Sequence, residues 1–368
     1  MTKSLLIAPQ WIGDAVMTQP LMAQLQARGE RLTVAALPWV APIYEAMPEC
    51  EQVLVLPFKR GSPELLNRWR WARSIKGQFD RAYVCPNTFK SALLALWAGI
   101  AVRVGYVGEM RRCLLTQSLP NPNQHERTSM VAFYTALALD GPLHPVALGV
   151  DVVGMQTPAQ PRLHVSSEAT QSALQAHGLK AQGFIVLAPG AEYGAAKRWP
   201  AHYAAQLCAA LQTPVVLLGS DKDRGIAQEI LGAVRELTAS GVTPSVGRGH
   251  VVDLTGRTTL LEAMALIASA RGVVSNDSGL MHVAASLGTP QVALFGSSSP
   301  LHTPPLSDQA QVLWLKTQGD YGGNVDCAPC FKRTCPLEHF RCMNDLSVKR
   351  VLPLVQVWDA PAAQWGGR

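Results

Sequence analysis

Short runs of hydrophobic residues alternate with longer helical patterns over the first third of the chain. Strand, helix and strand repeated in this order predict a parallel sheet with helices on both faces. The helical stretches include Val16–Arg28 and Lys90–Gly99. The expected strands are Leu5–Pro9, Leu32–Leu37, Val53–Pro57, Arg81–Pro86 and Val102–Tyr106.

The same pattern returns in the second half after an interruption rich in turn formers, from Asn121 to Pro161, which contains one helical stretch at Met130–Leu139. We therefore predict an N-terminal domain at 1–160, a second domain at 161–345 and a C-terminal helix and tail at 346–368. The expected strands of the second domain are Phe184–Ala188, Val215–Leu218, Val252–Leu254, Gly272–Ser275 and Gln291–Phe295. Its expected helices are Trp199–Leu211, Arg224–Leu237, Thr259–Ala270 and Ser278–Leu287.

Two such series predict an α/β protein with two Rossmann-like, doubly wound parallel-sheet domains that face a central cleft. The 368 residues, of which 48% are hydrophobic, suffice for two cores. This architecture is common in glycosyltransferases, although architecture alone does not identify a function.

Composition indicates a cytoplasmic protein. The apolar run after Lys3 is too short for a signal peptide, and no run reaches the roughly 18 residues that span a bilayer. The best candidate, Ser91–Val102, is better explained as a buried helix. Eight cysteines without a targeting signal indicate reduced thiols.

The net charge of +6 is spread unevenly, because basic residues and tryptophans gather between Phe58 and Gly77, opposed only by Glu64. This composition suits an anionic membrane surface or a phosphorylated ligand. It is equally compatible with a solvated helix face whose tryptophans turn inward. The residues concerned are Lys59, Arg60, Arg68, Trp69, Arg70, Trp71, Arg73 and Lys76.

Two loops of the second domain contain glycine or serine directly after a strand. The first ends in Lys197 and Arg198, which suit a pyrophosphate leaving group or a solvated helix start. In the second, Gly219 and Ser220 precede two aspartates, Asp221 and Asp223, either of which could bind a sugar hydroxyl or cap a helix.

The third loop is the strongest signal. Asn276 and Asp277 end a strand, and Ser278 and Gly279 open an apolar helix whose free N–H groups and dipole favour an anion. His282 follows one turn later on the same side, or alternatively is a core histidine bonded to a carbonyl. The three loops together predict a nucleotide diphosphate site.

Several common signatures are missing. Neither a Walker A sequence nor a G-x-G-x-x-G fingerprint occurs at a strand–helix junction, and no D-x-D pair is placed to hold a divalent cation. We therefore expect donor binding without a metal or cofactor, with the diphosphate charge carried by Lys197, Arg198 and the helix start. A Rossmann oxidoreductase or epimerase is disfavoured because a Tyr-x-x-x-Lys pair is also missing, whereas a non-catalytic nucleotide-sugar-binding protein remains an alternative.

Five segments, in order along the chain, together resemble the ADP-heptose:lipopolysaccharide heptosyltransferases of glycosyltransferase family 9, and most of all the members that add the second heptose. The resemblance extends to about Pro305. It implies a GT-B fold, with an acceptor-binding first domain and a donor-binding second domain. The segments are WIGDAVMTQPL, VCPNTFKSALLALWAGI, GEMRR, PGAEYGAAKRWP and NDSGLMHVAASLGTP.

The resemblance also implies a reaction: inverting transfer of L-glycero-D-manno-heptose from ADP-heptose to the first heptose of the inner core. A paralogous enzyme with another core acceptor would carry the same donor motifs. The acceptor is anchored in the membrane, which favours peripheral binding of the chain to the cytoplasmic face of the inner membrane and no binding to nucleic acid.

The family's motifs map onto residues of this sequence. The catalytic base maps to Asp14, although the residues alone favour a role for Asp14 in capping the following helix, which Thr18 could take instead. Lys197 maps to the lysine that contacts the donor diphosphate. The motif that binds ADP maps to Asp277, Ser278, Gly279 and His282, and the candidate acceptor contacts are Gly13, Lys90, Arg111 and Arg112.

Four cysteines, with His339 among them, lie within sixteen residues near the C-terminus. The first two form a C-x-x-C pair that suits a structural zinc site, but the second two are six residues apart. Reduced cysteines that pack a loop, or a disulfide formed on oxidation, are the alternatives. The candidate zinc ligands are Cys327, Cys330, Cys335 and Cys342.

Overall fold

The computed structural model describes residues 1–59, 61–124, 127–139, 159–240, 251–316 and 325–359. The chain forms two compact units, Met1–His164 and Val165–Arg368. The division expected from the sequence, at residue 160, lies just before this point. The expected C-terminal helix, α13, packs within the second unit, and residues 360–368 lie outside the described residues.

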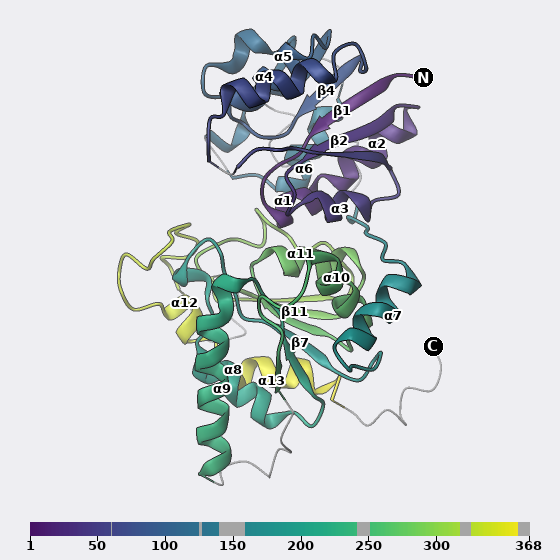
Figure 1. The fold of residues 1–368 in the computed structure, drawn as a ribbon. Coiled ribbons are helices and arrows are strands. Elements are labelled where there is room, and N and C mark those ends of the chain that lie inside the picture. The colour runs from purple at the N-terminus through teal and green to yellow at the C-terminus, as the bar shows by residue number, and fades with distance from the viewer. Residues whose placement is uncertain (60, 125–126, 140–158, 241–250, 317–324, 360–368) are drawn as a thin grey trace. The chain divides into compact units, whose positions relative to one another are not determined.

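The first unit is built on a six-stranded parallel sheet in the order β3-β2-β1-β4-β5-β6 (Figure 1). The buried run of β1 places this strand between β2 and β4, so the chain leaves its carboxyl end near the middle of the sheet. The strands are β1 Lys3–Ile7, β2 Arg31–Ala36, β3 Cys50–Val55, β4 Arg81–Val84, β5 Val102–Tyr106 and β6 Gln117–Leu119.

Helices cover the sheet of the first unit on both faces, as the alternating pattern predicts (Figure 1). Helices α4 and α5 pack together, while α6 packs against α1 and α2. The helices are α1 Ile12–Met17, α2 Gln19–Ala27, α3 Ala41–Glu45, α4 Leu65–Ser74, α5 Phe89–Trp97 and α6 Met130–Thr135, with short 3-10 turns η1 Arg111–Leu114, η2 Pro122–Gln124 and η3 Ala136–Ala138.

The second unit repeats the design with a six-stranded parallel sheet in the order β12-β11-β10-β7-β8-β9. Its main core cluster consists mostly of aliphatic side chains from β7, β8, β10, β11 and β12 and from α8, α9 and α13, together with Trp199 and Trp358. The strands are β7 Ile185–Ala188, β8 Val215–Leu217, β9 Val251–Asp253, β10 Val273–Asn276, β11 Gln291–Phe295 and β12 Ala310–Trp314.

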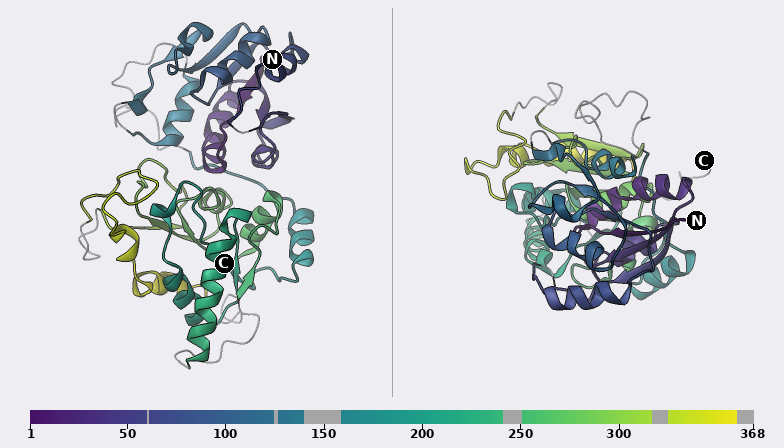
Figure 2. Two further views of the ribbon diagram at one scale, coloured as in Figure 1. Left: turned by 60° about the vertical axis from the view of Figure 1, so that its left-hand side comes forward. Right: turned by 90° about the horizontal axis from the view of Figure 1, so that it is seen from above.

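Two groups of helices lie against this second sheet (Figure 2). Helix α8 packs with α9 and α13, and α10 packs with α7 and α11. The helices are α7 Ser167–Ala176, α8 Ala201–Ala210, α9 Arg224–Ala239, α10 Leu260–Ser269, α11 Gly279–Ser286, α12 Arg341–Asn344 and α13 Val348–Gln356, with 3-10 turns η5 Ala195–Lys197 and η6 Asp221–Asp223.

The structure differs from the expected elements at identifiable points. The helix expected at Val16–Arg28 is two helices that meet at Thr18, because Pro20 lacks an N–H and its ring would clash with the preceding turn of a continuous helix. The edge strands β6 and β12 were not expected; β6 has only three residues, too few to produce a pattern. Among the described residues, no helix is both long and apolar enough to cross a membrane.

Candidate active site

Asp14 lies just beyond the carboxyl end of β1, in the first turn of α1. Trp11 occupies the N-cap position, so the alternative in which Asp14 caps the helix is wrong. The phenolic hydroxyl of Tyr134 donates a hydrogen bond of 3.1 Å to Asp14 Oδ1. Sequence reasoning missed Tyr134, because nothing local connects it to a residue 120 positions away.

Thr18 differs in detail from its expected role as a cap. It is the N-cap residue of α2, but its side chain makes no capping hydrogen bond. Its hydroxyl instead donates to the carbonyl of Ala15 at 2.7 Å and lies 3.1 Å from the hydroxyl of Tyr44. Thr18 thus fixes the end of α1 to α3, which carries Tyr44.

The candidate acceptor contacts have different surroundings. Gly13 precedes Asp14 in the first turn of α1, and Lys90 lies in the first turn of α5, with its Nζ 3.4 Å from the carbonyl of Gly61. Arg112 is exposed. These three residues are positioned on or near the surface of the first unit.

Arg111 departs from the expected surface position because it is fully buried. Its guanidinium donates to the carbonyl of Tyr106 at 2.7 Å, to Oδ1 of Asn87 at 2.9 Å and to the carbonyl of Pro86. Burial lowers the pKa of Arg111 to about 10. These contacts hold together the loops that leave β4 and β5, so they give Arg111 a structural role.

In the second unit, Lys197 forms an ion pair with Asp277, with 2.5 Å between Nζ and Oδ2. Lys197 ends the loop after β7, and Asp277 directly follows β10, the neighbouring strand. The hydroxyl of Thr303 donates to the other carboxylate oxygen of Asp277 at 3.3 Å. The structure therefore brings together two residues that the sequence placed in separate loops.

Asn276 fastens these loops to each other. Its side-chain amide donates to the carbonyl of Pro189 at 2.8 Å and to that of Gly190 at 3.3 Å, and its oxygen accepts from the N–H of Trp199 at 3.1 Å. Because Asn276 is buried, these hydrogen bonds are shielded from water and hold the Lys197 loop against β10.

Helix α11 begins at Gly279, with Ser278 as its N-cap residue. The Ser278 side chain makes no capping hydrogen bond, and its Oγ lies 3.1 Å from Oγ of Ser275. Without a side-chain cap, the first N–H groups of this eight-residue helix are the donors that an anion requires.

His282 is buried one turn into α11. Burial lowers its pKa to about 4, although the Asp277 carboxylate acts in the opposite direction. His282 is therefore a neutral imidazole at neutral pH, which can form hydrogen bonds but adds no positive charge to the site.

In the loop after β8, the structure favours the capping alternative for Asp223. Ser220 and Asp223 form a capping box, in which Asp223 Oδ2 accepts from the backbone N–H and the hydroxyl of Ser220, both at 2.8 Å. A Cβ at Gly190 would lie 2.4 Å from this carboxyl group, and one at Gly219 would lie 2.9 Å from it. Glycine is thus required at both positions to admit Asp223.

The other aspartate of this loop, Asp221, is exposed and forms an ion pair of 2.8 Å with Arg224. Asp223 therefore caps the 3-10 turn η6, and Asp221 pairs with Arg224, the first residue of α9. Gly219 and Ser220 remain at the carboxyl end of β8, as the sequence places them.

Buried polar atoms without partners mark one residue that the sequence analysis had proposed, Arg198, and two that it missed, Ser297 and Ser298. Among the described residues, Arg198 Nε and the hydroxyls of Ser297 and Ser298 are buried without a hydrogen bond. The two serines follow β11 after Gly296. Since such atoms normally have a partner, they are candidates for contact with a ligand. The sequence did contain a signal for these serines, because a glycine and three serines, Gly296 to Ser299, follow a buried strand.

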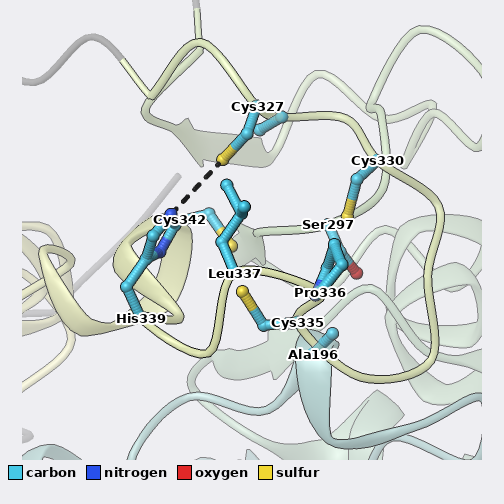
Figure 3. Close-up of a pocket in the computed structure, with 10 residues that line it drawn as sticks. Ala196, Ser297, Cys327, Cys330, Cys335, Pro336, Leu337, His339 and Cys342 are labelled. Atoms are coloured by element: carbon cyan, nitrogen blue, oxygen red, sulfur yellow. Dashed lines mark hydrogen bonds between the residues drawn. The ribbon is translucent and has the colours of Figure 1, made fainter.

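The four cysteines and His339 line one pocket (Figure 3). Cys327 Sγ lies 3.9 Å from His339 Nε2, and burial raises the pKa of Cys342 to about 12. No three histidine, cysteine or acidic side chains in the described ranges are placed to hold one metal ion, however. The arrangement does not support the predicted zinc site.

The segment 327–342, which contains the four cysteines, instead braces the loops that follow β7 and β11. The carbonyl of Arg333 accepts from the N–H of Ala196 at 3.0 Å, and the N–H of Phe331 donates to the carbonyl of Ser297 at 2.7 Å. A Cβ at Gly194 would lie 2.3 Å from the Arg333 carbonyl, so this close approach requires glycine. The segment thereby supports the loop that presents Lys197.

Comparisons with known proteins show to which family the chain belongs. The sequence profile of glycosyltransferase family 9 (heptosyltransferase) matches residues 68–341. Lipopolysaccharide heptosyltransferase 2 of Escherichia coli is 39% identical over 86% of this chain and 88% of its own length. Lipooligosaccharide heptosyltransferase 2 of Haemophilus influenzae is 38% identical, over 84% and 88% respectively.

Solved structures show the same relationship. That of the ADP-heptose lipopolysaccharide heptosyltransferase II of Escherichia coli superposes with a TM-score of 0.79 at 35% identity, and covers 97% of this chain and 98% of that one. The expected GT-B fold class with two doubly wound parallel sheets is confirmed, as is the expectation of a glycosyltransferase. The chain belongs to glycosyltransferase family 9, the heptosyltransferases.

Proposed function

We propose that the chain moves L-glycero-D-manno-heptose from ADP-heptose to the first heptose of the lipopolysaccharide inner core, with inversion. Relatives named heptosyltransferase 2 or II support this donor and acceptor. The observation that carries the proposal is the Lys197–Asp277 pair beside the uncapped start of α11. It combines a cation, a carboxylate and free N–H groups, which a nucleotide diphosphate sugar can bind.

In this proposal the donor diphosphate lies at the strand ends of the second unit. Lys197, Arg198 and the first N–H groups of α11 carry the negative charge that develops as ADP leaves. Asp277 holds Lys197 in place through their ion pair. Neutral His282 holds the nucleotide by a hydrogen bond. Gly219 and Ser220 lie at the neighbouring strand end and complete the expected donor site.

Asp14 acts as the general base. It takes the proton from the acceptor hydroxyl as that oxygen attacks the anomeric carbon and the bond to the ADP oxygen breaks. A single displacement inverts the anomeric configuration and requires no nucleophile from the enzyme. Gly13, Lys90 and Arg112 are the proposed acceptor contacts, and Arg111 acts through the loops that it holds.

The basic helix α4 is the proposed membrane contact. It buries Arg68 and Ala72 toward the unit, and Arg68 lies 4.4 Å from the ring centre of Phe58. On its other side Leu66 is 71% exposed and Trp69 48% exposed. The expected helix thus has one tryptophan facing outward, rather than two facing inward.

Basic side chains surround these exposed apolar ones. Arg70, Arg73 and Lys76 are exposed on the same helix or at its end, while Arg60 lies outside the described residues. Apolar side chains that enter the headgroup region, flanked by cations that attract anionic lipid, are the two features of a peripheral membrane surface. We propose that the chain docks there on the cytoplasmic face of the inner membrane.

Incubation with ADP-heptose and a series of truncated cores, with the product identified by mass, tests the function. We expect heptose on cores that end in one heptose. Transfer only to a different core would identify a paralogous enzyme, and binding of ADP-heptose without any transfer would identify a binding protein.

The matched variants are Asp14→Asn and Asp80→Asn. Asp80 is an exposed aspartate of the same unit, which accepts a hydrogen bond from the N–H of Lys3. We expect Asp14→Asn to abolish transfer while ADP-heptose still binds, and Asp80→Asn to retain activity. Near-normal turnover of Asp14→Asn would show that the base is another residue.

A further inference from the structure

Tyr134 is buried on α6, and its hydroxyl donates to Asp14 Oδ1 at 3.1 Å. A buried hydroxyl needs a partner, and here the partner is the carboxylate at the candidate catalytic position. We propose that Tyr134 is a positioning residue, which orients the Asp14 carboxylate and stabilises its charged form. The inference rests on the proposed role of Asp14 as base.

The surroundings of Tyr134 make it a rigid support. The neighbouring Phe133 stacks on Tyr106 with ring centres 4.0 Å apart and an interplanar angle of 16°. The hydroxyl of Tyr106 donates to the carbonyl of Phe133 at 2.6 Å. Helix α6 is therefore fixed to the end of β5 as well as packed against α1 and α2, which holds the Tyr134 hydroxyl in place.

Helix α1 needs such support because it is short and its N-cap residue, Trp11, makes no side-chain capping hydrogen bond. Its C-terminal end is held through Thr18 and Tyr44. Its N-terminal end carries Asp14, which accepts a hydrogen bond from the Tyr134 hydroxyl. Two tyrosines thus contact the two ends of one helix, and the hydroxyl of Tyr134 is the one that donates to the Asp14 carboxylate.

Tyr134 is the donor in its hydrogen bond with Asp14. Burial, and next the Asp14 carboxylate, raise the pKa of Tyr134 well above its usual range, so the hydroxyl keeps its proton at neutral pH. A hydrogen bond to the charged form of a carboxylate lowers the pKa of that carboxylate. Removing the hydroxyl should therefore raise the pKa of Asp14 and leave the carboxylate less well oriented.

The test compares Tyr134→Phe with Tyr44→Phe, which removes a buried hydroxyl from the other end of α1. For Tyr134→Phe we expect kcat to fall about tenfold at neutral pH, with the KM for ADP-heptose within about twofold of the wild-type value. The acid limb of the pH–rate profile should move up by about one pH unit or less. Tyr44→Phe should leave this limb in place.

A second measurement separates this inference from the proposed function. Carbon-13 NMR titration of the Asp14 carboxyl, without substrates, should show the upward pKa shift in Tyr134→Phe whether or not the enzyme turns over. An unchanged carboxyl pKa together with an unchanged rate would overturn the inference. Normal turnover of Asp14→Asn would instead overturn the base assignment, and the positioning role would fall with it.

Discussion

Lys197 Nζ and Asp277 Oδ2 lie 2.5 Å apart, although 80 residues separate them in the sequence. The Asp277 side chain is 4% exposed and that of Lys197 17% exposed, so little water screens the pair. A second ion pair in the same unit joins Lys222 to Glu192 at 2.8 Å, and both of its side chains are exposed. The two lysines therefore provide a matched comparison.

We expect Lys197→Ala to weaken ADP binding by about tenfold to a hundredfold, because a charge-assisted contact to phosphate is lost. The variant should also unfold at a lower temperature, since Asp277 is left buried without its cation. Lys222→Ala should change both properties little, because an exposed pair contributes about 1 kcal/mol or less. Calorimetric titration with ADP and thermal unfolding provide the measurements.

The double variant Lys197→Ala/Asp277→Asn separates the two effects. Neutralising the carboxylate should recover part of the unfolding temperature, but the affinity for ADP should stay low. Wild-type affinity in Lys197→Ala would show that the diphosphate binds elsewhere.

His282 should make the protein sensitive to acid. Its pKa is lowered to about 4 in the folded chain, against an ordinary value of about 6.5 in the unfolded one. The unfolded chain therefore binds more protons between these values, and stability should fall as pH drops from about 6.5 toward 4, by up to about 3 kcal/mol at the lower end.

A His282→Gln variant lacks this titration. We expect urea unfolding to show a weaker pH dependence between pH 6.5 and 4 for the variant than for the wild-type chain, even if the variant is less stable at pH 7. Parallel pH dependence of the two proteins would mean that His282 is not buried in its neutral form.

Helix α4 should bind anionic vesicles. Each arginine near such a surface contributes about 1 kcal/mol, so Arg70→Gln/Arg73→Gln should weaken binding by about tenfold or more. A double variant of exposed cations in the other unit, Lys180→Gln/Arg235→Gln, removes the same charge and should bind as the wild type does.

Cosedimentation with vesicles of phosphatidylglycerol and phosphatidylethanolamine, against phosphatidylcholine alone, measures this effect. Trp69→Ala should also weaken binding. The share of the binding free energy that this variant loses should be larger at high salt, where the contribution of charge is reduced. Equal losses in both double variants would indicate attraction by net charge alone.

The cysteine pocket should not require a metal. We expect purified protein to hold much less than one zinc per chain, and a chelator to leave the unfolding temperature unchanged within about 1 °C. One zinc per chain, whose removal lowers the unfolding temperature by several degrees, would restore the zinc prediction.

The sequence alone was sufficient to predict the two α/β series, ten of the strands and the loops that hold the donor-site candidates. This follows because strand and helix periodicity, and the glycine and serine residues after each strand, are local features. Lys197 and Ser278 could thus be assigned to strand ends before any contact was known.

Tertiary structure alone decided which of these residues meet. Tyr134 approaches Asp14, Asn276 ties two loops together, Arg111 is buried, and Asp223 fits against Gly190 and Gly219. Each of these outcomes depends on packing between segments far apart in the chain, which leaves no periodic trace in the sequence. Whether a charged side chain binds a ligand or supports the fold is set by those long-range contacts.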